Sequence, residues 1–182
     1  MWVFGYGSII WRPDFDWVER RAGYIEGWKR RFWQHSTDHR GVPEQPGRVV
    51  TLVPEEEVDC WGIAYRVDPG ARERIASKLD VREAGGYRRH RVDVRAERGD
   101  GQIIESALMY IATPQNPHFA GPAPIEEMAR QVARASGPSG PNTEYVFELA
   151  AALREHGAVD AHVFELERAV RRYVEGTDGA SR

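Results

Sequence analysis

The chain opens with Trp2-Val3-Phe4-Gly5-Tyr6-Gly7-Ser8, a short apolar run that predicts a β-strand ending in a tight glycine loop. Residues 24–33 then mix aromatic and charged side chains in rough alternation, which is typical of a long, half-buried strand. Two further β-rich runs, 48–53 and 60–67, are separated by the acidic segment 54–57. We expect that segment to form a turn between two strands.

Helical signals begin at Asp68-Pro69, where an aspartate suited to an N-cap precedes a proline, and Ala71, Ile75 and Leu79 then recur at helical spacing. The last third of the chain carries three more helical patterns. They run from Pro124 to Gly137, from a capping Asn142 to Gly157, and from Asp160 to Glu175. Strands therefore dominate the chain up to residue 111 and helices dominate the rest. This pattern predicts an α+β fold, with helices packed on a mostly antiparallel or mixed sheet that is either open or closed into a small barrel.

The length of 182 residues predicts one domain over residues 1–176, followed by a disordered tail at 177–182. The net charge of −3 argues against a strongly basic nucleic-acid binder and against a general attraction to anionic membranes. The single cysteine, Cys60, excludes an internal disulfide, and its place in a predicted strand indicates a buried small side chain. Because no apolar run is long enough to span a bilayer and the first residues lack a signal-peptide pattern, we expect a cytoplasmic protein.

The loop Gly5-Tyr6-Gly7-Ser8 has two glycines that let consecutive backbone N–H groups turn toward one point, as in an anion-binding nest. A dinucleotide fingerprint would need a third glycine where Ile10 stands, so we reject that interpretation. Ser8 also lacks the context of a serine-hydrolase nucleophile. The loop alone is compatible with a plain turn or with a site for a carboxylate or phosphate.

The segment Asp80-Val81-Arg82-Glu83-Ala84-Gly85-Gly86-Tyr87 ends the first predicted helix with charged side chains and a Gly-Gly break. A carboxylate at such a corner can face a cleft and serve as a general acid or base. The alternative is a solvated helix end with a capping glycine.

Two other clusters invite functional interpretations that the sequence does not favour. His35-Ser36-Thr37-Asp38-His39 has two imidazoles and a carboxylate but no third histidine in reach, so a polar loop is preferred over a metal site. The basic and aromatic residues of 28–33 suit an RNA-binding strand. Strand alternation divides them between two faces, and the net charge is negative, so no nucleic-acid partner is expected.

Taken in order, seven segments of the chain resemble the ChaC-type γ-glutamylcyclotransferases over about residues 1–175. The segments are Trp2-Val3-Phe4-Gly5-Tyr6-Gly7-Ser8 with Trp11, Arg31-Phe32-Trp33-Gln34, Ser36-Thr37-Asp38-His39-Arg40-Gly41, Pro46-Gly47-Arg48-Val49-Val50-Thr51-Leu52, Arg82-Glu83-x-Gly85-Gly86-Tyr87, Gly121-Pro122-Ala123-Pro124 and Gly137-Pro138-Ser139-Gly140-x-Asn142-Thr143-Glu144-Tyr145. Two positions depart from the family pattern. Ile9 replaces the usual leucine, and His35 replaces a small residue, usually glycine.

The resemblance implies a small mixed β-barrel with flanking helices and an enzyme that needs no cofactor. We also expect activity without a metal, because the cluster His35–His39 lacks a credible third ligand. It implies that reduced glutathione is cyclised at its γ-glutamyl group to 5-oxo-L-proline, releasing L-cysteinylglycine. By the family motif Glu83 is the acid/base, and the substrate-binding residues are Val3, Phe4, Gly5, Tyr6, Gly7 and Ser8. Arg82, Tyr87 and Tyr145 are candidates for a second contribution. We expect a monomer, and two alternatives stay open: an enzyme acting on other γ-glutamyl compounds, and a non-catalytic binding or regulatory module.

Overall fold

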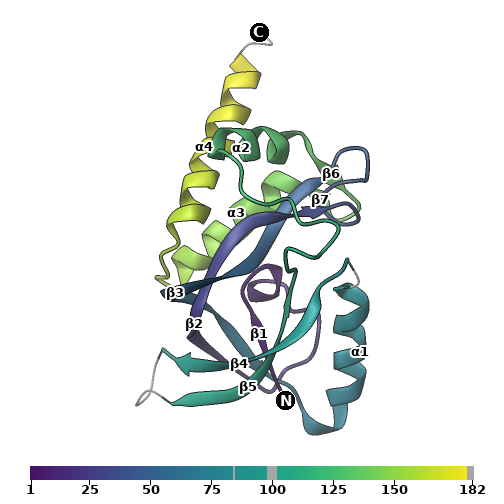
Figure 1. The fold of residues 1–182 in the computed structure, drawn as a ribbon, viewed down its shortest axis with the longest axis vertical. Helices are drawn as coiled ribbons and strands as arrows, with labels where there is room; N and C mark the ends of the chain where they lie inside the picture. The colour runs from purple at the N-terminus through teal and green to yellow at the C-terminus, as the bar shows by residue number, and fades with distance from the viewer. Residues whose placement is uncertain (84, 98–101, 180–182) are drawn as a thin grey trace. The chain divides into compact units, whose positions relative to one another are not determined.

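The structure is a computed structural model, and it describes residues 1–83, 85–97 and 102–179. The chain forms two compact units, which are described separately below (Figure 1). The first comprises Met1–Arg30 and Leu52–Pro117, and the second comprises Arg31–Thr51 and His118–Arg182. The single domain predicted for residues 1–176 stays a prediction.

Five strands close into a barrel (Figure 1). They are β1 (Trp2–Gly5), β2 (Glu19–Ser36), β3 (Gly47–Arg66), β4 (Arg88–Ala96) and β5 (Ile103–Ile111). Their order around the barrel is β1-β3-β2-β4-β5, and β1 pairs antiparallel with β3 and parallel with β5. The barrel is therefore mixed, and with its accompanying helices it confirms the predicted α+β fold.

The first unit adds helix α1 (Arg72–Arg82) to its barrel strands. The helix follows a single 3₁₀ turn, η2 (Pro69–Ala71), at which the carboxylate of Asp68 accepts a hydrogen bond from the Gly70 N–H at 2.8 Å. This contact confirms the predicted capping aspartate. Ile75 and Leu79 are the buried residues of α1, as their helical spacing predicts.

The acidic segment 54–57 does not form the expected turn. Strand β3 runs without interruption from Gly47 to Arg66, and the side chains of 54–57 are exposed along it. Glu57 has a φ of 59°, a local irregularity within the strand. The prediction was wrong because a run of acidic residues indicates exposure to water, and exposure does not require the chain to reverse.

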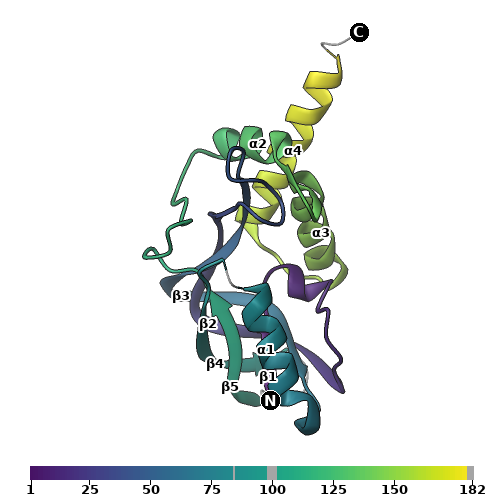
Figure 2. The ribbon, with the colours of Figure 1, turned by 90° about the vertical axis from the view of Figure 1, so that its right-hand side faces the viewer.

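The second unit carries the helices of the last third, which pack on one another (Figure 2). They are α2 (Ile125–Arg134), α3 (Asn142–Glu155) and α4 (Ala161–Gly179), with the two-residue strands β6 (Ser136–Gly137) and β7 (Gly140–Pro141) between α2 and α3. Their shared core is apolar and fully buried, with Met128, Val132, Leu149, Leu153, Leu166 and Val170. Helix α4 extends beyond its predicted end at Glu175, and residues 180–182 of the predicted tail lie outside the described residues.

Asn142 does not cap α3. It is the first residue of the helix, Pro141 occupies the N-cap position, and no side chain caps it. The buried Asn142 amide instead pairs with the backbone of Arg48, accepting its N–H at 2.6 Å and donating to its carbonyl at 2.8 Å. The capping prediction was wrong because the backbone of β3 offers both atoms of the amide a partner, whereas a cap would satisfy only its oxygen.

Two side chains from segments considered in the sequence analysis are buried. Cys60 is buried, as expected, with its sulfur 3.5 Å from the guanidinium of Arg30. Arg30 is only 2% exposed and donates to the carbonyl of Trp61, so this member of the basic segment 28–33 is enclosed by protein. Within the described ranges, no helix is both long enough and apolar enough to cross a bilayer.

Candidate active site

The predicted substrate loop begins inside the barrel of the first unit. Val3 and Phe4 lie on β1, and their side chains are at most 1% exposed. Tyr6 is also buried, and its hydroxyl donates to the carbonyl of Tyr110 on β5 at 2.7 Å. Because these three side chains are used in packing, a ligand bound along this stretch would meet backbone groups.

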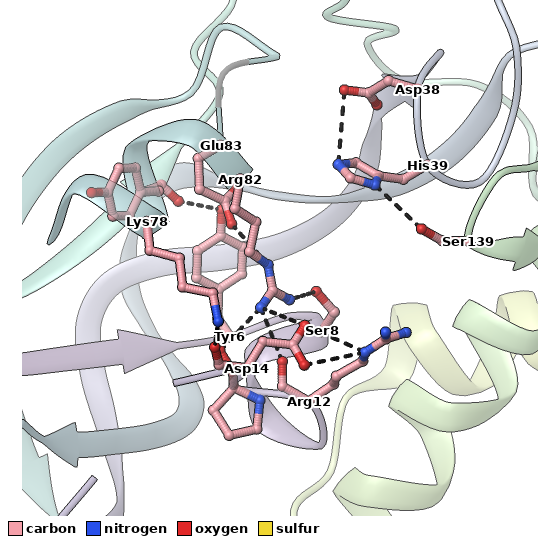
Figure 3. A network of polar contacts seen from close by, with 12 residues as sticks. Tyr6, Ser8, Arg12, Asp14, Asp38, His39, Lys78, Arg82, Glu83 and Ser139 are labelled. Carbon is pink, nitrogen blue, oxygen red and sulfur yellow. Dashed lines mark hydrogen bonds and ion pairs between the residues drawn. The ribbon is translucent and has the colours of Figure 1, made fainter. Parts of the chain in front are cut away.

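The second half of the loop turns sharply. A Cβ at Gly5 would lie 2.5 Å from the Cγ2 of Ile9, so only glycine fits there without displacing that side chain. The 3₁₀ turn η1 (Ser8–Ile10) follows, with the N–H of Ile10 bonded to the carbonyl of Gly7 at 2.9 Å. The Ser8 hydroxyl accepts a 2.8 Å hydrogen bond from Arg82, which ties the loop to the end of α1 (Figure 3).

Glu83 occupies the C-cap of α1, directly after Arg82. Its side chain is 17% exposed, so it is largely enclosed by protein without being fully buried. One of its oxygens lies 3.6 Å from Nε of Arg82 (Figure 3). Since Arg82 also bonds Ser8, a single guanidinium connects the predicted acid/base with the predicted substrate loop.

The corner after Glu83 is held by a residue that the sequence analysis missed. Gly86 has a φ of 87°, and a Cβ there would lie 2.6 Å from the side-chain nitrogen of Asn116. The same nitrogen donates to the carbonyl of Gly85 at 3.0 Å, and Asn116 is only 6% exposed. Asn116 lies between two prolines some 30 residues further along the chain, and no local spacing connects it with this corner.

A second contact fastens the end of α1 to the barrel. The Tyr110 hydroxyl donates to Asp80 at 2.7 Å, and Arg89 on β4 donates to the same carboxylate. The hydrogen bond from Arg89 is the main reason that the pKa of Asp80 is lowered, while burial is the main cause that raises the pKa of Tyr110 to about 12. Asp80 is therefore a charged structural anchor between the end of α1 and the barrel.

The cluster of residues 35–39 lies in the second unit. His39 has its Nδ1 3.3 Å from the Ser139 hydroxyl and its Nε2 3.9 Å from Asp38, and the side chains of His39 and Asp38 are more than half exposed (Figure 3). Burial, followed by the charges of Arg48 and His118, lowers the pKa of His35. Among the described residues, no three His, Cys, Asp or Glu side chains gather as they would around a metal ion. The expected independence from metal stays a prediction.

The remaining predicted contributors are divided between the units. In the first unit, the backbone N–H of Tyr87 donates to the carbonyl of Glu83 at 3.3 Å, which closes the corner on itself. In the second unit, the ring of Tyr145 packs edge-on against Phe32, with the ring centroids 6.1 Å apart. The neighbouring Glu144 forms an ion pair with Arg40 at 3.1 Å. Of these residues, only Tyr87 lies in the same unit as Glu83.

The fold places the chain in a known structural class, that of the γ-glutamylcyclotransferases. A crystal structure of a yeast γ-glutamyl cyclotransferase specific to glutathione superposes with a TM-score of 0.90 at 31% sequence identity, covering 95% of this chain and 96% of that one. The family model described as ChaC-like protein matches residues 1–173. The chain therefore belongs to the ChaC-like family.

Relatives of known name are similar over almost the whole chain. The glutathione-specific γ-glutamylcyclotransferase 1 of Danio rerio is 47% identical, with 93% of this chain and 88% of that protein covered. The protein of the same name in Homo sapiens is 44% identical, with 93% of this chain and 78% of that protein covered. These matches make the family assignment independent of any single motif.

Proposed function

We propose that this chain is a carbon–nitrogen lyase that degrades reduced glutathione, a glutathione-specific γ-glutamylcyclotransferase. The names of the relatives from Danio rerio and Homo sapiens and the yeast structure support this substrate. Within the first unit, the observation that carries the proposal is the connection from Glu83 through Arg82 to Ser8. It brings a partly exposed glutamate and a rigid glycine loop into one cluster.

In the proposed reaction, the α-amine of the γ-glutamyl group attacks its own δ-carbonyl carbon. A new C–N bond closes the five-membered ring, and the amide bond to the cysteine nitrogen breaks. Glu83 accepts the proton that the attacking amine loses and then delivers it to the departing cysteine amine. The products are 5-oxo-L-proline and L-cysteinylglycine, and no oxidant, reductant or cofactor enters the balance.

The proposed task of residues 3–8 is to bind the substrate through backbone N–H groups. A folded γ-glutamyl group is needed for attack, because cyclisation gains most of its rate from bringing the amine and the carbonyl together. The buried Tyr6 side chain and the tightly packed Gly5 support a rigid loop, which suits this positioning role. The same backbone donors would suit the substrate α-carboxylate or the oxyanion that develops at the carbonyl.

The direct test is to incubate the purified protein with reduced glutathione and to quantify products by chromatography. Equimolar 5-oxo-L-proline and L-cysteinylglycine are expected. If γ-glutamyl dipeptides or amines are cyclised but glutathione is not, the enzyme acts on another γ-glutamyl substrate. If no γ-glutamyl compound is turned over, the chain is a binding or regulatory module and the proposed activity is wrong.

A further inference from the structure

The Arg82 side chain contacts several residues of the first unit in addition to Glu83. Its guanidinium donates to the Ser8 hydroxyl at 2.8 Å and to the carbonyls of Arg12 and Pro13 at 3.0 and 3.1 Å (Figure 3). It also lies 3.4 Å from the carboxylate of Asp14, and its side chain is 20% exposed. The chain bends tightly at this point, since Asp14 has a φ of 55°, a conformation uncommon outside glycine.

We infer that Arg82 is a positioning residue of the active site, holding the substrate loop and the Glu83 carboxylate in fixed relation. This inference rests on the proposed function. The segment 11–18 has no regular secondary structure, so the shape of the chain after Ser8 depends on such side-chain contacts. The Arg82 guanidinium supplies one donor to the Ser8 hydroxyl and others to two consecutive carbonyls.

The positive charge of Arg82 also attracts the Glu83 carboxylate. A carboxylate at the C-terminus of a helix faces the negative end of the helix dipole, and a nearby cation offsets that repulsion. The Nε of Arg82, 3.6 Å from the Glu83 oxygen, is such a cation. Loss of Arg82 would remove this favourable charge and the contact that orients the Glu83 side chain.

Lysine can replace the charge of Arg82 but not its planar set of donors. The need for these donors is therefore tested by two variants, Arg82→Gln and Arg82→Lys. Arg74→Gln is the matched control, because Arg74 is on the same helix, is 66% exposed and forms a 3.6 Å ion pair with the exposed Asp16. For each variant, kcat and KM for glutathione are measured, and thermal unfolding reports whether the protein is folded.

For Arg82→Gln we expect kcat to fall by about tenfold or more, with a smaller change in KM and with the protein still folded. For Arg82→Lys we expect a similar fall in kcat, and this variant decides the question if Arg82→Gln does not fold. Arg74→Gln should match the wild type. A merely structural role would lower the melting temperature and leave the kcat of the folded protein unchanged.

Values of kcat within about twofold of the control for both variants would overturn the inference while the wild type still produces 5-oxo-L-proline. A wild type that produces none from glutathione overturns the proposed function together with it. The two failures are thus distinguished by the wild-type reaction alone.

Discussion

Gly86→Ala perturbs the corner that follows Glu83 in two ways, through the backbone conformation and through a close contact of the added methyl group. The backbone there has a φ of 87°, and forcing an alanine into a left-handed conformation costs about 1–2 kcal/mol. The added methyl group would also lie 2.6 Å from the side-chain nitrogen of Asn116, so this buried amide must move. Losing its hydrogen bond to Gly85 adds about 1 kcal/mol.

Gly27→Ala is the matched control within the same unit. Gly27 has a φ of 77°, and a Cβ there meets nothing within 4 Å. It should therefore show the backbone cost alone, about 1–2 kcal/mol, whereas Gly86→Ala should lose about 2–3 kcal/mol. The free energy of unfolding from urea denaturation measures both.

Turnover distinguishes the two variants more sharply. Shifting the corner displaces Glu83, and a displacement near 1 Å can cost a catalytic group about 100-fold in rate. We expect Gly86→Ala to lose at least about tenfold in 5-oxo-L-proline formation and Gly27→Ala to retain wild-type turnover. Equal stability losses in the two variants, with normal turnover in Gly86→Ala, would show that Asn116 does not hold this corner.

Three further predictions concern pH, substrate and metal. His162 accepts the Phe32 N–H at 3.1 Å, and burial lowers its pKa to about 4. Between pH 6.5 and 4, His162 is therefore protonated in the unfolded state but neutral in the folded state. The free energy of unfolding should fall by up to about 3 kcal/mol as the pH drops through this window. His162→Gln, which keeps an acceptor, should lose this dependence in urea titrations at pH 7 and 4.5. Reduced glutathione should exceed γ-glutamyl-alanine in kcat/KM, because binding energy from the cysteinylglycine portion can orient the reacting centre; comparable values would favour a broader substrate range. Activity should survive EDTA, since the proposed reaction needs only proton transfer and positioning, and loss of turnover with rescue by zinc or manganese would contradict this.

The sequence predicted the larger features of the fold because those features follow from local patterns. The division between a strand-rich and a helix-rich part, the Asp68 cap and the buried Ile75 and Leu79 all depend on spacing within a few residues. Closure of the five strands into a barrel was left open by the residues themselves. It entered only through the family resemblance, because strand order depends on contacts between distant segments.

The features that the sequence did not predict depend on partners far along the chain. Asn142 is of a residue type, and lies at a position, that suit a helix N-cap, but its amide pairs with the backbone of Arg48. Asn116 closes the corner at Gly85 and Gly86 across about 30 residues. In both cases the polar side chain could form hydrogen bonds with several neighbours in the sequence. The partner that it has in the structure is distant along the chain, so the spacing of residues does not predict it.

The candidate site itself was predictable only in part. The sequence alone left Glu83 and the glycine loop as two weak and separate signals, and the resemblance joined them. Arg82 was named through the resemblance, and the structure adds its contacts to Ser8 and to the Glu83 carboxylate. Its role could not be deduced from its neighbours, because an arginine at the end of a helix is equally compatible with a solvated cation.

The most direct test of the account is the turnover of glutathione by Glu83→Gln, compared with Glu144→Gln. The amide keeps the size of the carboxylate but cannot accept the proton of the attacking amine, so kcat should fall by about 10²–10⁴-fold, or roughly 3–5 kcal/mol, with a smaller change in KM. Glu144 is half exposed in the first turn of α3 and is paired with Arg40. Glu144→Gln should therefore lower the stability of the protein and leave its turnover unchanged. Near-normal turnover by Glu83→Gln together with an inactive Glu144→Gln would contradict the assignment of Glu83 as the catalytic acid and base.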